Sequence, residues 1–165
     1  MTVKFSCLLA AGVLGVSLYA GAASAADYAV VNLSTDVDQP VDAVWKKIGG
    51  YCDIAAWLKV TCDYTSGTGD VGTVRHLTIR SNGVDEVMVA KTAHSYTYTQ
   101  PTTTILYHGT LEVVANGKGK SKILYNLIWD LTSDGTDEAK AKDRDGRAKR
   151  FTEALASMKA IADGK

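Results

Sequence analysis

Hydrophobic and polar positions follow two different rhythms along this chain. From residue 28 to residue 37 they alternate, which predicts a β-strand, because successive side chains of a strand point to opposite faces. The same alternation returns in short runs between residues 60 and 132, separated by clusters of Ser, Asn, Asp, Gly and Pro. Such clusters form turns, so we expect six further strands in this part of the chain.

Helical spacing occurs on both sides of these six strands. Pro40 lies near the first turn of a predicted helix that Gly49-Gly50 ends, and a second short helix is expected over residues 53–58. The apolar face of the first helix comprises Val41, Val44, Trp45 and Ile48. After residue 135, steps of three or four predict an amphipathic helix of roughly 25 residues, with Gly146 as a weak point or bend. Its apolar face is Ala148, Phe151, Leu155, Met158 and Ala162, and its opposite, cationic face is Lys140, Lys142, Arg147, Lys149 and Lys159.

The predicted order is therefore one strand, two short helices, six strands and one long helix, which indicates an α+β fold. A curved antiparallel sheet of six or seven strands must cover its apolar face, and the long helix is the largest element available to do so. A curved sheet wrapped around one helix leaves a space between them. Such a space is typical of a cavity for an apolar ligand.

Several short motifs occur in an order typical of one superfamily. They are Pro40-x-x-x-Val44-Trp45, Trp57-Leu58-Lys59, Gly69-x-x-Gly72-x-Val74-Arg75, Asp85-Glu86 and Tyr96-x-Tyr98, followed by the closing helix. With them the chain resembles the START-like (SRPBCC) superfamily, in its polyketide cyclase/dehydrase branch, over nearly all of residues 28–163. The resemblance implies a helix-grip fold and one ligand-cavity domain over residues 26–165. It does not single out a function, because the superfamily includes hormone receptors, lipid carriers, cyclases and periplasmic accessory proteins.

Strand alternation indicates which side chains face the space between sheet and helix. In the strand over residues 73–80, we expect Arg80 to face solvent beside a turn, so that Arg75, Leu77 and Ile79 face inward. The complete candidate ligand-binding set is Lys59, Arg75, Leu77, Ile79, Glu86, Met88, Tyr96, Tyr98, Tyr107, Tyr125, Trp129, Phe151 and Leu155.

Four tyrosines fall on inward strand positions: Tyr96, Tyr98, Tyr107 and Tyr125. Tyr107 is expected on the inward face of a strand over residues 105–113. Each tyrosine is either an ordinary core residue with a satisfied hydroxyl or a ligand contact. Four together predict an aromatic cavity that offers several hydroxyl groups.

Three residues are candidates for acid–base chemistry: Glu86, Lys59 and Tyr107. Glu86 shares its strand face with Val84 and Met88, so its carboxylate needs a partner, and Arg75 on the neighbouring strand is the natural one. This pair is either structural or involved with ligand. Lys59 matches by position the lysine with which the resembling hormone receptors meet a ligand carboxylate; a lysine exposed at a helix end is the alternative.

The N-terminal 25 residues are typical of a secretory signal peptide. Lys4 precedes an apolar stretch, and Ala23-Ser24-Ala25 forms an A-x-A cleavage site. The alternative, a membrane anchor, requires about 20 uninterrupted apolar residues, and this stretch is shorter and contains glycines. We therefore expect an exported, periplasmic protein without a membrane span after cleavage.

Two cysteines, Cys52 and Cys62, remain after cleavage. Thiols in an oxidising compartment usually pair, which predicts a disulfide and a chain reversal between them; free thiols and a metal site are the alternatives. The three histidines have no metal-ligand or triad spacing, so we expect no metal. No glycine-rich phosphate loop opens a helix, so no nucleotide cofactor is expected.

Charge and composition narrow the class of partner. The chain has 18 basic and 18 acidic residues, which argues against nucleic acid as a partner.

Three function hypotheses remain. The first is a binding protein or carrier for a hydrophobic, aromatic or lipid-like small molecule. The second is a cofactor-free cyclase/dehydratase-type enzyme, and the third is an accessory protein of periplasmic oxidation that binds a protein partner. No residue constellation demands catalysis, so the sequence favours the first.

Overall fold

The structure, a computed structural model, describes residues 27–79 and 81–165 of the chain. Two of the expectations lie outside the described residues: the signal peptide over residues 1–25 and the exposure of Arg80.

The elements follow the predicted order of one strand, two short helices, six strands and one long helix. They are β1 (Tyr28–Val37), α1 (Val41–Ile48), α2 (Ile54–Leu58), β2 (Thr61–Ser66), β3 (Val74–Ile79), β4 (Asn82–Lys91), β5 (Ser95–Thr99), β6 (His108–Ala115), β7 (Ser121–Asp130), a 3₁₀ turn (Thr132–Asp134) and α3 (Asp137–Asp163). The α+β helix-grip fold is confirmed.

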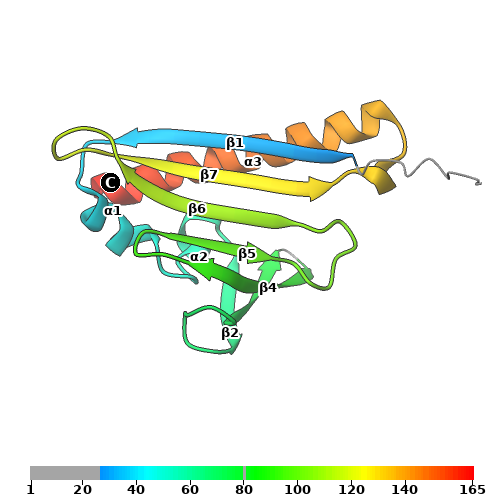
Figure 1. Cartoon of the computed structure of the whole chain (residues 1–165), viewed down its shortest axis with the longest axis horizontal. Coiled ribbons are helices and arrows are strands. Elements are labelled where there is room, and N and C mark those ends of the chain that lie inside the picture. The colour runs from blue at the N-terminus through cyan, green and yellow to red at the C-terminus, as the bar shows by residue number, and fades with distance from the viewer. Residues whose placement is uncertain (1–26, 80) are drawn as a thin grey trace, which may run out of the picture.

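All seven strands form one antiparallel sheet in the order β1-β7-β6-β5-β4-β3-β2. Consecutive strands are neighbours from β2 to β7, and β1 returns to pair with β7 along its whole length, from Tyr28 opposite Asp130 to Val37 opposite Ser121. Figure 1 shows the curvature of the sheet: β2 runs nearly across the direction of β1, and α3 lies behind β1 and β7. The sheet thus wraps around the helix.

The core lies between the concave face of the sheet and α3. β7 contributes the side chains that alternation placed inward, and α3 contributes Phe151, Leu155, Met158 and Ala162, as its spacing predicts. Gly146 does not interrupt α3, which continues as one helix of 27 residues through this position. In the described part of the chain, no helix combines the length and the apolar character of a membrane span.

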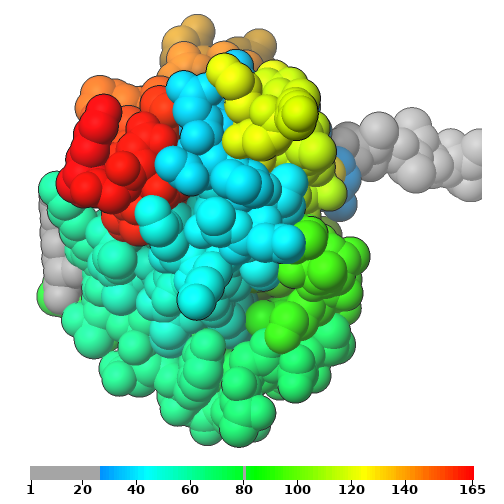
Figure 2. Space-filling model, turned by 90° about the vertical axis from the view of Figure 1, so that its left-hand side faces the viewer, coloured from blue at the N-terminus to red at the C-terminus, as the bar shows by residue number. Residues whose placement is uncertain are grey.

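Helix α1 closes one end of this core. Val44 and Ile48 are completely buried, and the Lys47 ammonium donates to the carbonyl of Ala162 near the end of α3 at 2.6 Å. Figure 2 views this end, where α1 (cyan) lies between the C-terminal part of α3 (red) and the turn that joins β6 and β7 (yellow). Gly49 follows the last residue of α1, as predicted. A Cβ there would lie 2.3 Å from the Trp45 ring, so the position requires glycine.

The segment before β6 differs from the prediction. β6 begins at His108, so Ile105 and Tyr107 belong to a loop and not to a strand. Leu106 takes a positive φ of 49°, which extended strand backbone does not allow, and the Gln100 N–H donates to the Tyr107 carbonyl to close the loop. Tyr107 is nevertheless buried, as expected.

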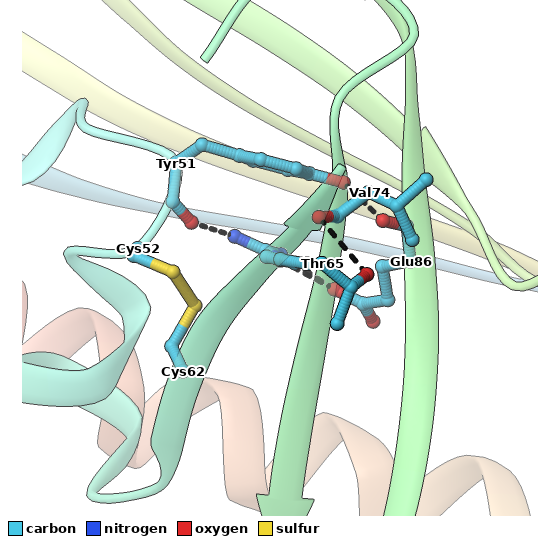
Figure 3. The surroundings of a disulfide bond; sticks show 7 residues. Tyr51, Cys52, Cys62, Thr65, Val74 and Glu86 are labelled. Atoms are coloured by element: carbon cyan, nitrogen blue, oxygen red, sulfur yellow. Dashed lines mark hydrogen bonds and ion pairs between the residues drawn. A yellow bond between two sulfur atoms is a disulfide. The ribbon is translucent and has the colours of Figure 1, made fainter. Parts of the chain in front are cut away.

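A disulfide joins Cys52 and Cys62, whose Cα atoms are 5.5 Å apart. Cys52 lies just before α2, and Cys62 lies in β2, so the chain reverses through α2 as the pairing requires. Figure 3 shows the disulfide next to Tyr51. The bridge links the segment of Tyr51 and Cys52 to β2, the edge strand of the sheet.

We expect reduction of this disulfide to lower the free energy of unfolding by about 2.5–3 kcal/mol, because the bridge closes a loop of about ten residues in the unfolded chain. The measurement is guanidinium unfolding of residues 26–165 with and without reductant. A Cys52→Ser/Cys62→Ser double variant should match the reduced protein and should not respond to reductant. Equal midpoints for the oxidised and reduced wild type would contradict the prediction.

Candidate functional site

A small cavity of about 90 Å³ lies between the sheet and the middle of α3. Its wall is mainly apolar and aromatic, with a carboxylate, an amide, two phenols and two guanidinium groups. The lining residues are Ile54, Leu58, Leu77, Ile79, Val84, Glu86, Tyr98, Gln100, Tyr107, Arg147, Arg150 and Phe151. Elements α2, β3, β4, β5 and α3 all contribute, so the cavity is the gap that sheet curvature leaves beneath the helix.

Two open grooves meet this cavity at its rim. One, of about 650 Å³, shares Leu58, Ile79, Val84 and Arg150 with the cavity and continues past Lys59. The other, of about 600 Å³, follows the N-terminal half of α3 and shares Arg147 and Arg150 with the cavity. The cavity is therefore flanked by the two grooves, with the shared side chains between them.

An ion pair forms the polar side of the cavity, as strand alternation predicted. Arg75 and Glu86 are directly opposite each other on β3 and β4, and both are buried. The Arg75 Nε and Nη2 donate to Glu86 Oε2 at 2.8 and 2.6 Å. The second carboxylate oxygen, Oε1, accepts from the Gln100 side-chain amide at 2.9 Å. Glu86 thus lies on the cavity wall with both oxygens engaged, and Arg75 lies behind it.

Aromatic rings enclose the Arg75 guanidinium. Its Cζ lies 4.0 Å from the centre of the Tyr51 ring, 4.8 Å from that of Tyr98 and 5.6 Å from that of Tyr96. The Arg75 Nη1 also donates to the Tyr51 backbone carbonyl, and the Tyr51 hydroxyl donates to the Glu86 backbone carbonyl at 3.0 Å. Figure 3 shows the Tyr51 ring and carbonyl on this side of the bridge. These contacts compensate a charge that would otherwise be costly to bury.

The four predicted inward tyrosines are all buried, but they do not all reach the cavity. Tyr98 and Tyr107 line it, whereas Tyr96 and Tyr125 lie in the core beside it. The Tyr98 and Tyr125 hydroxyls share a hydrogen bond of 2.9 Å. Burial raises the pKa of all four phenols. At neutral pH all four therefore stay protonated and do not act as tyrosinate bases, and Tyr98 and Tyr107, which line the cavity, can offer their hydroxyl groups to a ligand.

The predicted ligand residues fall into three groups. Those on the cavity wall are Leu77, Ile79, Glu86, Tyr98, Tyr107 and Phe151. Those buried in the core without reaching the cavity are Arg75, Met88, Tyr96, Tyr125, Trp129 and Leu155. Lys59 is exposed at the end of α2 and lines the groove beside the cavity. The ligand contacts of all three groups stay predictions.

Unusual backbone conformations flank the cavity on two sides. Lys59, directly after the lining residue Leu58, has φ 56° and ψ 52°, and Leu106, directly before the lining residue Tyr107, has φ 49°. Such left-handed conformations cost a non-glycine residue roughly 1–2 kcal/mol. Each of these conformations turns the chain directly beside a residue of the cavity wall.

The structure corrects one orientation. Arg147, expected on the outer face of α3, turns toward the sheet: its guanidinium lies 5.3 Å from the Tyr107 ring centre and 5.1 Å from that of Trp129. It also pairs with Asp143 at 3.0 Å, and Asp143 accepts from the Trp129 indole at 2.7 Å. The stacking of a planar guanidinium on two rings explains this orientation.

Arg147, Arg150, Gln100 and Tyr51 are the polar site residues that the sequence reasoning missed. A signal for both arginines was present: Arg147 precedes Phe151 by one helical turn and Arg150 precedes Ala154 by one turn, and both later residues are buried. Tyr51 lies in an irregular segment between two helices, where no periodicity predicts the direction of a side chain.

The histidines lie away from the cavity. His76 pairs with Asp85, and His94 pairs with Asp42, each at 2.6 Å, two contacts that the sequence did not predict. Within residues 27–79 and 81–165, no three His, Cys, Asp or Glu side chains gather into a group that could hold a metal ion.

Comparison with known proteins shows which family and which solved structures this chain is similar to. Residues 28–162 match the model of a family described as polyketide cyclase/dehydrase and lipid transport. A search of curated proteins finds no match. Among solved structures, the XoxI protein of Bacillus cereus is 17% identical with a TM-score of 0.66, over 79% of this chain and 93% of that one.

Two further solved structures are named after reactions. The Zhui aromatase/cyclase of Streptomyces is 14% identical, with a TM-score of 0.67 over 83% of this chain and 94% of that one. Truncated norcoclaurine synthase of Thalictrum flavum is also 14% identical, with a TM-score of 0.59 over 82% of this chain and 94% of that one. At these identities the likeness shows a shared fold.

Proposed function

The chain belongs to the polyketide cyclase/dehydrase and lipid transport family of the START-like superfamily, and on this premise we propose that it is a binding protein or carrier for a hydrophobic small molecule. The molecule lies between the sheet and α3, with one ring or the end of an apolar chain in the cavity. Ligand pockets usually measure about 300–1,000 Å³, so a cavity of about 90 Å³ holds only part of a ligand. The remainder occupies the groove that shares Leu58, Ile79, Val84 and Arg150 with the cavity.

Binding is favoured over catalysis by one observation: the acid–base groups in the cavity are already hydrogen-bonded or protonated. Glu86 is held by an ion pair with Arg75 at one oxygen and by a hydrogen bond from Gln100 at the other, contacts that are typical of a structural carboxylate. Burial raises the pKa of the Tyr98 and Tyr107 phenols, which keeps them protonated. These groups are suited to orienting the polar end of a ligand.

The proposal also places the protein outside the cytoplasm, in the periplasm of a Gram-negative cell. Two features support this location. The apolar N-terminal stretch ends in Ala23-Ser24-Ala25, which is typical of a cleaved signal peptide. The Cys52–Cys62 disulfide is of the kind that persists in oxidising compartments.

Native mass spectrometry of protein purified from the periplasm that contains it tests the binding function. We expect a retained small molecule on the wild type. Val84→Phe, which fills the cavity rim, should remove it, whereas the control Val89→Phe, at an exposed position of the same strand, should keep it. Circular dichroism checks that both variants fold.

Two results would contradict the function. One is a wild-type protein that carries no small molecule and does not enhance the fluorescence of the neutral probe N-phenylnaphthylamine. The other is equal retention of the molecule by the folded Val84→Phe and Val89→Phe variants.

A further inference from the structure

Arg150 lies where the cavity and both grooves meet, since it lines all three. We infer that Arg150 binds an acidic group of the ligand, so that the ligand is an amphipathic anion, with an apolar or aromatic body and a carboxylate or similar acid at one end. This inference rests on the proposed binding function and specifies the class of ligand.

Arg150 makes no ion pair within the described residues, whereas three charged side chains near it do. Arg147, which precedes Arg150 by one turn of α3, pairs with Asp143. Glu153, one turn later, pairs with Lys149. Inside the cavity the Glu86 carboxylate is neutralised by Arg75. A side chain that is half-buried at the rim of an apolar cavity therefore keeps a free positive charge.

The other charged groups on the two grooves do not cancel this charge. Lys59 lines the larger groove, and Lys142 lines the one along α3, so both add positive charge. Asp134 and Asp143 also line the α3 groove, and Asp143 is committed to Arg147 and Trp129. The larger groove, which shares four residues with the cavity, has no acidic residue in its described lining. The larger groove is therefore the one in which the surrounding charges favour an anionic ligand.

The chemistry of Arg150 suits a ligand that has one acidic end. A guanidinium presents a planar set of donors that can bind both oxygens of a carboxylate, and such charge-assisted bonds strengthen where water is partly excluded. Leu58, Ile79 and Val84, which line the cavity and the groove on either side of Arg150, contact the apolar body. An anion with its apolar part in the cavity thus places its acid at the rim.

A matched pair of fluorescent probes tests this inference. Anilinonaphthalene sulfonate and N-phenylnaphthylamine share their rings, but only the first carries an acidic group. We expect the wild type to bind the sulfonate more tightly, and Arg150→Gln to weaken sulfonate binding about tenfold while neutral-probe binding stays unchanged. Arg150→Lys should recover part of the loss. Arg144→Gln, on the same helix with its guanidinium paired to Asp145, should change neither probe.

The outcomes separate this inference from the function on which it rests. If the neutral probe binds and Arg150→Gln leaves sulfonate binding unchanged, the acidic-ligand inference is wrong and the binding function stands. If Arg150→Gln weakens both probes equally, Arg150 acts through shape and not through charge, which also overturns the inference. If the wild type carries no small molecule and binds neither probe, the binding function itself fails. Added salt should weaken the sulfonate affinity of the wild type more than that of Arg150→Gln.

Discussion

Replacing Arg75 with methionine is expected to lower the free energy of unfolding by about 3–5 kcal/mol, because it leaves the Glu86 carboxylate buried without its counter-charge. The loss extends beyond one ion pair, since the Tyr51 carbonyl loses its donor and the three tyrosine rings lose the guanidinium they enclose. Guanidinium unfolding followed by fluorescence measures the effect.

The double variant Arg75→Met/Glu86→Gln should be less destabilised than Arg75→Met alone. No unpaired charge remains in it, and the amide introduced in place of the Glu86 carboxylate still offers an oxygen to Gln100. The four unfolding energies form a double-mutant cycle, whose coupling term measures the pair. Lys91→Met, in the exposed Lys91–Asp70 pair, is the control and should change stability little. Additive losses for Arg75 and Glu86 would show that the two side chains do not act as a pair.

The second large effect is expected at alkaline pH. Tyr51, Tyr96, Tyr98, Tyr107 and Tyr125 are all buried, and desolvation raises the pKa of each phenol above its ordinary value. In the unfolded chain these phenols lose their protons near pH 10, whereas in the folded protein they keep them. The unfolded state then binds fewer protons, so stability is unaffected below pH 10 and falls as the pH rises above it.

Each buried tyrosine contributes a loss of about 1.4 kcal/mol for each pH unit above 10, so five together should unfold the protein over a narrow range of pH. The measurement is the unfolding midpoint between pH 7 and 12, together with the ultraviolet absorbance of tyrosinate. Tyr125→Phe should make the pH dependence shallower, and the control Tyr28→Phe, at an exposed position, should not. A gradual titration of all tyrosines near pH 10 in a protein that stays folded would contradict the prediction.

The fold was predictable because alternation and helical spacing are strong where an element has one buried face. β1 and β7 show this: both are long, and in each the more buried positions alternate with the less buried ones. The Arg75–Glu86 pair followed from the same rule, since both residues occupy inward positions of neighbouring strands. Of the candidate site, the strand residues were therefore accessible from the sequence.

The residues that were misplaced or missed are those that periodicity does not govern. Tyr107 lies in a loop whose path depends on the positive φ of Leu106, a conformation that leucine rarely adopts. Arg147 was assigned by its charge to the outer face, although the aromatic rings of Tyr107 and Trp129 offer its guanidinium a better environment inside. The charge of a long cationic side chain suggests that it faces solvent, but the groups around it determine where it lies.

The pairing of the first strand with the last has a consequence for how this chain matures. The neighbour of β1 in the sheet is β7, and Tyr28 pairs with Asp130. β1 therefore stays unpaired until β7 has been made. During synthesis, β1 leaves the ribosome long before β7 and α3 exist, and the helix-grip fold cannot close until nearly the whole chain is made. A precursor that stays open in this way is suited to crossing a membrane unfolded, as the export that we propose requires, and under that proposal the disulfide forms after the crossing.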